Sequence, residues 1–193
     1  MNLTNFIRRF RPSRATRHGE RGVAAVEFAL ALPVWMTLLL GISDGAYMML
    51  VDQRVDRVAY SVTDIVTQSQ TVSRTDLDSI LLAAGQLMQP FTFGTRGIVI
   101  ITSLYKPAGQ PTKISWQYTG GGSLSRGSKI GQLGATPTMP SNLTLNDNEN
   151  VIVAEVYYSF TPMFINAGIL SSGDVYRVAV YKPRLSPLIT PPA

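Results

Sequence analysis

The residues best placed to do chemistry stand together near the N-terminus, where residues 21–28 read RGVAAVEF. Glu27 is the only charged residue in the apolar run from Val23 to Ile42. An acid at the centre of a bilayer costs about 2.5–3.5 kcal/mol, and less near a helix end. A cut after Gly22 would give Val23 a new α-ammonium group and make Glu27 the fifth residue of the shortened chain. The carboxylate of one copy would then find a partner in the amine of its neighbour, and each charge would relieve the other's desolvation.

Elsewhere the sequence offers only weak candidates for chemistry. Residues 122–129 (GSLSRGSK) nearly form a phosphate-binding loop, but Ser128 stands where the motif requires lysine, which favours a flexible surface loop. Residues 146–149 (NDNE) lack the spacing of a calcium loop and indicate a solvated turn. Glu155 lies in an apolar strand with no second carboxylate nearby. We therefore expect it at the solvent face, or paired with an arginine or lysine.

Composition excludes several classes of site. The chain has 193 residues, no cysteine and one histidine, His18. Disulfides, thiolate metal sites and sites that need two imidazoles are therefore excluded. We predict no catalytic, cofactor-binding or metal site, and hence a protein that is not an enzyme.

The formal net charge of +5 lies entirely in residues 1–22, which hold six arginines and one glutamate. Residues 23–193 balance 11 basic against 11 acidic residues. A basic face for nucleic acid is excluded because no such face remains outside the short N-terminal arm. Arginines directly before an apolar run are typical of a membrane segment whose N-terminus stays in the cytoplasm.

Residues 23–42 read VAAVEFALALPVWMTLLLGI. Twenty helical residues span roughly 30 Å, the thickness of the apolar core of a bilayer. Pro33 would cost about 3 kcal/mol inside a soluble helix, whereas membrane helices tolerate proline, usually with a kink. We therefore predict a single membrane anchor from Val23 to Ile42, including Pro33, with the chain beyond about residue 45 on the outer side.

A secretory signal peptide is the main alternative to an anchor. Gly41 and Ser43 would satisfy the small-residue rule for a mature chain that starts at Asp44. The apolar run is long for that class, however, and Glu27 is badly placed in it. A twin-arginine signal fits less well, because Arg8 and Arg9 lie far ahead of the run.

The N-terminal region resembles a class III (type IV) prepilin leader. The resemblance rests on an arginine-rich leader, on Gly22 followed by four small or apolar residues and then Glu27-Phe28, and on Leu32-Pro33 and Gly41 further along. Residues 20–65 resemble the TadE-like family of minor pilins and pseudopilins from bacterial Tad pilus systems. The resemblance implies that prepilin peptidase cuts between Gly22 and Val23. It also implies that Glu27 and Phe28 serve recognition and subunit assembly.

The same resemblance implies the cellular setting. The protein would sit in the bacterial inner membrane as a single-pass protein, with a cytoplasmic N-terminus and a periplasmic or extracellular C-terminal domain. Its partners would be prepilin peptidase, other Tad minor pilins, the major pilin, the inner-membrane assembly platform and membrane lipid, with no nucleic acid and no cofactor. The TadE, TadF and TadG branches, and incorporation into the fibre, are left open.

We predict an α+β fold, in which a long N-terminal transmembrane helix packs on a C-terminal antiparallel β-sheet domain. Val51, Val55, Val58, Val62 and Ile65 are spaced 4, 3, 4 and 3 residues apart, which indicates one apolar face of a helix that continues past the anchor. This face is expected to pack on the protein's own sheet, with packing on neighbouring subunits as the alternative.

The rest of the chain predicts one more helix and four strands. The helix covers residues 76–88, capped by Ser73 or Thr75. The strands cover residues 97–105, 113–119, 151–160 and 174–182, with a loop over 120–150 and an extended proline-rich tail over 183–193. The predicted parts are a leader (1–22), an N-terminal helix (23–70) and a head (71–193). The alternative function is an unprocessed single-pass anchor whose outer domain binds a ligand, a glycan or a surface.

Overall fold

The computed structural model describes residues 16–164 and 171–193, so the first fifteen residues of the predicted leader lie outside the described part. The chain divides into two units, residues 1–43 and 44–193. Helix α1 (Thr16–Thr67) runs through the described part of the first unit, with Pro33 inside it, and continues into the second. Its segment from Gly22 onward is long and apolar enough to cross a membrane, by length and composition.

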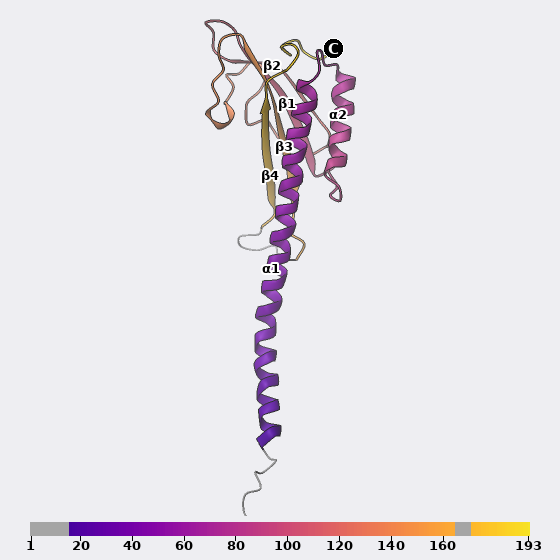
Figure 1. Ribbon diagram of the computed structural model, residues 1–193, viewed down its shortest axis with the longest axis vertical. Helices are drawn as coiled ribbons and strands as arrows, with labels where there is room; N and C mark the ends of the chain where they lie inside the picture. Colours follow the sequence, from indigo (N-terminus) through magenta and orange to yellow (C-terminus); the bar gives the residue numbers. More distant parts are fainter. Residues whose placement is uncertain (1–15, 165–170) are drawn as a thin grey trace, which may run out of the picture. The chain divides into compact units, whose positions relative to one another are not determined.

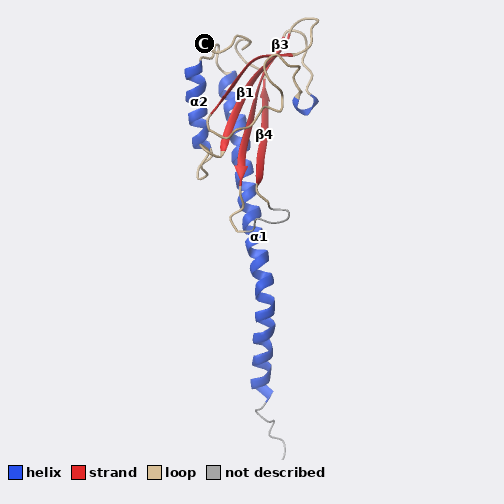
Figure 2. Ribbon diagram, turned by 180° about the vertical axis from the view of Figure 1, so that it is seen from behind, coloured by secondary structure: helices blue, strands red, loops and turns tan. Residues whose placement is uncertain are grey.

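The second unit is a four-stranded antiparallel sheet with helices on one face (Figure 1; Figure 2). Helix α2 (Arg74–Leu87) follows α1 and precedes β1 (Gly97–Lys106). The strand order is β2-β1-β3-β4, with β2 (Lys113–Gly120), β3 (Glu149–Phe160) and β4 (Gly173–Tyr181). A short 3-10 helix, Pro140–Asn142, interrupts the long loop between β2 and β3. The α+β fold predicted from the sequence is confirmed.

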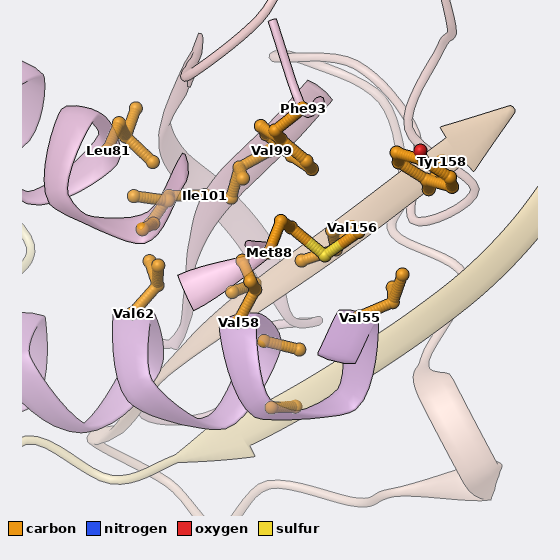
Figure 3. Close-up of a cluster of buried hydrophobic side chains, with 14 of the residues drawn as sticks. Val55, Val58, Val62, Leu81, Met88, Phe93, Val99, Ile101, Val156 and Tyr158 are labelled. Carbon is orange, nitrogen blue, oxygen red and sulfur yellow. The ribbon is translucent and has the colours of Figure 1, made fainter. Parts of the chain in front are cut away.

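The valine face of α1 forms the centre of the core. Val51, Val55, Val58 and Val62 are each no more than 1% exposed and belong to one core cluster with residues of α2 and the sheet. Figure 3 shows the last three of these valines beside Leu81 of α2 and Ile101 of β1. The prediction was wrong for Ile65, which is 45% exposed, while Val66 is fully buried in its place. The predicted spacing repeats every 3.5 residues, whereas a helix has 3.6 residues per turn, so residue 65 is rotated by about 40° from Val51, toward the edge of the buried face.

Both faces of the sheet are covered, which explains the continuous apolar run of β3. The helices cover one face, and residues from the loop between β2 and β3 cover the other. That second face includes Leu104, Ile114 and Val153, which pack with Ile130 and Leu145 from the loop. A strand buried on both faces needs apolar side chains in both directions, so the usual alternation is lost.

Polar contacts cap helix α2 and join strand β4 to helix α1 in the second unit. Ser73 caps α2 in a reciprocal box with Asp76, which confirms one of the two predicted caps. The hydrogen bonds donated by Ser73 hold the pKa of Asp76 below its usual value. Arg177 of β4 bridges Asp52 and Asp56 of α1, with 3.1 Å between its Nε and an Asp56 oxygen, and so offsets the repulsion between two acids one turn apart.

The proline-rich tail is more closely tied to the sheet than its composition suggested. Leu188 is 5% exposed, and its carbonyl accepts hydrogen bonds from Trp116 Nε1 at 2.9 Å and Ser103 Oγ at 2.7 Å. Its backbone N–H donates to Asn150 Oδ1 at 2.8 Å. Periodicity cannot reveal this contact, because the two donors and the one acceptor that bind Leu188 lie on three different strands.

Candidate functional site

The predicted cleavage position lies on an accessible stretch of helix. Gly22 and Val23 are both in α1, and both are exposed. A Cβ atom added to Gly22 would meet nothing within 4 Å. The packing of the described residues therefore does not require glycine at position 22. Any requirement for glycine there would come from another molecule that binds this stretch of helix.

Glu27 and Phe28 project from the same helix, one turn after Val23. Four residues of helix rise by about 6 Å, and residues at this spacing share a face. Both side chains are exposed, Phe28 to 67%. None of the ion pairs between described residues includes Glu27. The Glu27 carboxylate therefore lies on an exposed apolar helix surface with no ion-pair partner among the described residues.

The predicted anchor has the surface of a lipid-facing helix. Every large apolar residue from Val23 to Ile42 except Leu40 is exposed. Thr37 is a polar residue in this apolar stretch, and its hydroxyl donates a hydrogen bond of 2.8 Å to the backbone carbonyl of Pro33 in the preceding turn. Apolar surface on this scale marks a membrane or protein contact, and internal satisfaction of a hydroxyl lowers its cost in lipid.

Comparison with known protein families bears on this region. A family model described as TadE-like protein matches residues 22–63. The resemblance read from residues 20–65 is thereby confirmed. The matched residues, which we call the TadE-like segment, begin at the predicted cleavage glycine and run through the apolar stretch into the valine face. Comparisons with curated proteins and with solved structures gave no match.

The TadE-like segment contains all the site residues predicted from the sequence. Helix α1 places Gly22, Val23, Glu27 and Phe28 within two turns of one another. The match stops at Thr63, so it does not extend to α2 or the sheet. Across the described residues, no group of three acidic or histidine side chains is arranged to hold a metal ion.

Glu155 is a buried polar centre that sequence reasoning misplaced. It is fully buried on β3, not at the solvent face. Its carboxylate accepts hydrogen bonds from the hydroxyl of Ser128, from the Lys129 backbone N–H at 2.8 Å and from Tyr176 Oη at 3.0 Å. The ammonium of Lys129 lies over the Tyr176 ring, 3.7 Å from its centroid. The residues that mimicked a phosphate loop therefore bind the loop to the sheet.

The buried carboxylate of Glu155 contributes to raised pKa values of two nearby tyrosines, Tyr157 and Tyr176. Burial, followed by the charge of Glu155, raises the pKa of Tyr157 to about 12. The same two causes, in the same order, raise the pKa of Tyr176, whose hydroxyl donates to Glu155. Both phenols thus stay neutral and available as donors at physiological pH.

Asp44 is a second buried acid, named from the sequence only as the start of a secreted chain in the signal-peptide alternative. It is fully buried at the start of the second unit. Its carboxylate accepts the backbone N–H of Met163 at 2.8 Å and that of Phe164 at 3.1 and 3.2 Å. The available signal was its position, because Asp44 is the first charged residue after Glu27.

Proposed function

We propose that this protein is a minor pilin or pseudopilin of a Tad-type pilus system. It is made as a precursor, inserted in the bacterial inner membrane by residues 23–42, and cut by prepilin peptidase between Gly22 and Val23. The observation that carries the proposal is the TadE-like segment, which begins at the predicted cleavage glycine and contains an exposed apolar helix.

The chemistry of the helix surface supports this role. After the cut, the new amine of Val23 and the carboxylate of Glu27 belong to one face of an apolar helix. Neighbouring helices in lipid would pair the amine of one subunit with the carboxylate of the next, which fixes their register. Phe28 would contribute apolar contact beside that pair. The partners that we propose from the TadE-like match are other Tad minor pilins, the major pilin, the inner-membrane assembly platform and membrane lipid.

The charge distribution supports the orientation. The arginine-rich leader holds the N-terminus in the cytoplasm by the positive-inside rule, where the peptidase cuts. The second unit then lies on the periplasmic or extracellular side. Removal of residues 1–22 takes away the whole excess charge of +5, and so leaves a near-neutral subunit.

Replacing Glu27 with alanine tests the assembly role. We expect Glu27→Ala to be cut at the normal position but to lose association with the other pilus subunits. Breaking one partner of a desolvated ion pair costs about 3 kcal/mol or more, which corresponds to roughly 100-fold in affinity. The measurement is the amount of partner pilin that co-purifies with the tagged protein from native membranes, together with the processed fraction by mass.

A matched control separates the charge from the helix surface. Met36→Ala truncates another exposed side chain of the same segment and is expected to leave co-purification within about twofold, as surface substitutions usually do. Glu27→Gln, which keeps the shape and removes the charge, should behave as Glu27→Ala does. Normal co-purification by both Glu27 variants would rule out the amine–carboxylate pairing.

A further inference from the structure

The turn that follows β3 carries two exposed apolar side chains on a fixed backbone. Met163 is 63% exposed and Phe164 is 54% exposed. Their backbone N–H groups are the donors that the Asp44 carboxylate accepts, at 2.8 to 3.2 Å. Hydrogen bonds to an ionised acceptor are short and strong, so Asp44 holds this turn against its own helix.

The position of Asp44 in the chain places this turn near the membrane. Asp44 comes two residues after Ile42, the end of the predicted anchor, in a helix that continues through both residues. Two residues of helix rise by about 3 Å. Two residues of chain span about 7 Å at most in any conformation, so a backbone bound directly to Asp44 stays close to the end of the predicted anchor.

A cationic side chain flanks the same turn. Arg96 donates to the Ser159 carbonyl at 3.0 Å and to the Thr161 hydroxyl at 2.7 Å. None of the ion pairs between described residues uses its guanidinium. Apolar side chains beside an unneutralised arginine fit the interface of a bilayer that contains anionic headgroups, where the arginine meets phosphate and the apolar groups meet the acyl chains.

We propose that the turn at residues 161–164 is a second membrane contact, in which Met163 and Phe164 enter the outer lipid interface. Asp44 is the positioning residue: its buried carboxylate is already satisfied by backbone donors, so it can approach the apolar region without a bare charge. Two contacts, the anchor and the turn, would restrict how the second unit rocks on the bilayer before assembly. This inference rests on the membrane span of the proposed function.

The absence of native cysteine allows a direct test on the full chain. A single cysteine at Met163 (Met163→Cys) is labelled with an environment-sensitive fluorophore, with Phe164 left in place. The protein is reconstituted in vesicles of phosphatidylcholine and phosphatidylglycerol, with and without lipids that carry a quencher on the acyl chain. We expect a blue-shifted emission that is quenched by the acyl-chain quencher.

Two other cysteine variants serve as references. Leu39→Cys reports from the predicted anchor, where the side chain is 60% exposed. Leu185→Cys is a matched control, because Leu185 is equally apolar and 64% exposed. It follows Arg184, whose N–H donates to the carbonyl of Thr67, and Thr67 lies about 35 Å along α1 from Asp44. Quenching at residue 163 should fall between these two and exceed that at 185 several-fold.

Each remaining outcome has a distinct meaning. Quenching at 39 with none at 163 would overturn the membrane contact and leave the span intact, whereas no quenching at either position would overturn the span itself. A blue shift at 163 without lipid quenching would mean contact with another protein copy, which also contradicts the proposal. Asp44→Ala should reduce quenching at 163 several-fold and leave quenching at 39 unchanged, and unchanged quenching at both would overturn the positioning role.

Discussion

Replacing Gly22 with valine is expected to leave the precursor uncut, so that the membrane-extracted protein retains all 193 residues. The reason lies in the peptidase and not in the fold. Because a Cβ atom at residue 22 meets nothing within 4 Å, the folded helix has room for valine. Valine is also the better helix former by a few tenths of a kcal/mol. The measurement is intact mass, which would rise by the mass of the leader.

Gly41 provides a matched control for this substitution. It lies in the same helix, and a Cβ atom there also meets nothing within 4 Å. Gly41→Val should therefore be inserted and processed as the wild type is. Normal processing of Gly22→Val would contradict the assignment of the cleavage position, and failure of both variants would point to a general defect in insertion.

Replacing Glu155 with alanine is expected to produce the largest loss of stability in the second unit. The substitution removes the acceptor of three hydrogen bonds and leaves the Lys129 N–H and the hydroxyls of Ser128 and Tyr176 without it. Hydrogen bonds to a charged group contribute about 1.5–3 kcal/mol each, and buried donors left unpaired cost more, so we expect a loss of about 3–4 kcal/mol. Urea denaturation of the detergent-solubilised protein measures it.

An exposed acid provides the comparison for Glu155. The side chain of Asp147 is 52% exposed and pairs with Lys106 at 3.0 Å, and such surface pairs contribute about 0–1 kcal/mol. Asp147→Ala should therefore shift the urea midpoint far less than Glu155→Ala does. Equal shifts for the two variants would show that the buried carboxylate does not hold the loop to the sheet.

The elements that local patterns determine were predictable from the sequence. The valine spacing indicated the buried face of α1, and alternating, β-branched or continuously apolar runs indicated four strands close to their observed bounds. The motif around Gly22 and Glu27 pointed to the same segment that the family model matches. These features depend on residues within one or two turns of each other, which a linear reading captures.

Features that depend on distant contacts were not predictable. Glu155 resembled a surface residue because the loop that buries it lies 26 residues earlier in the chain. Asp44 entered the sequence analysis only as the start of a mature chain in the signal-peptide alternative, because the partners of its carboxylate lie about 120 residues later. The strand order, which puts β1 between β2 and β3, was likewise not predictable, because it depends on which distant strands become neighbours.

The central claim is that the working subunit begins at Val23. Intact-mass analysis and N-terminal sequencing of the protein extracted from its native membrane test this most directly. We predict a chain of 171 residues, Val23 to Ala193, with the six leader arginines removed. A start at Met1 would contradict the account in favour of an unprocessed anchor, and a start at Asp44 would contradict it in favour of a secreted domain.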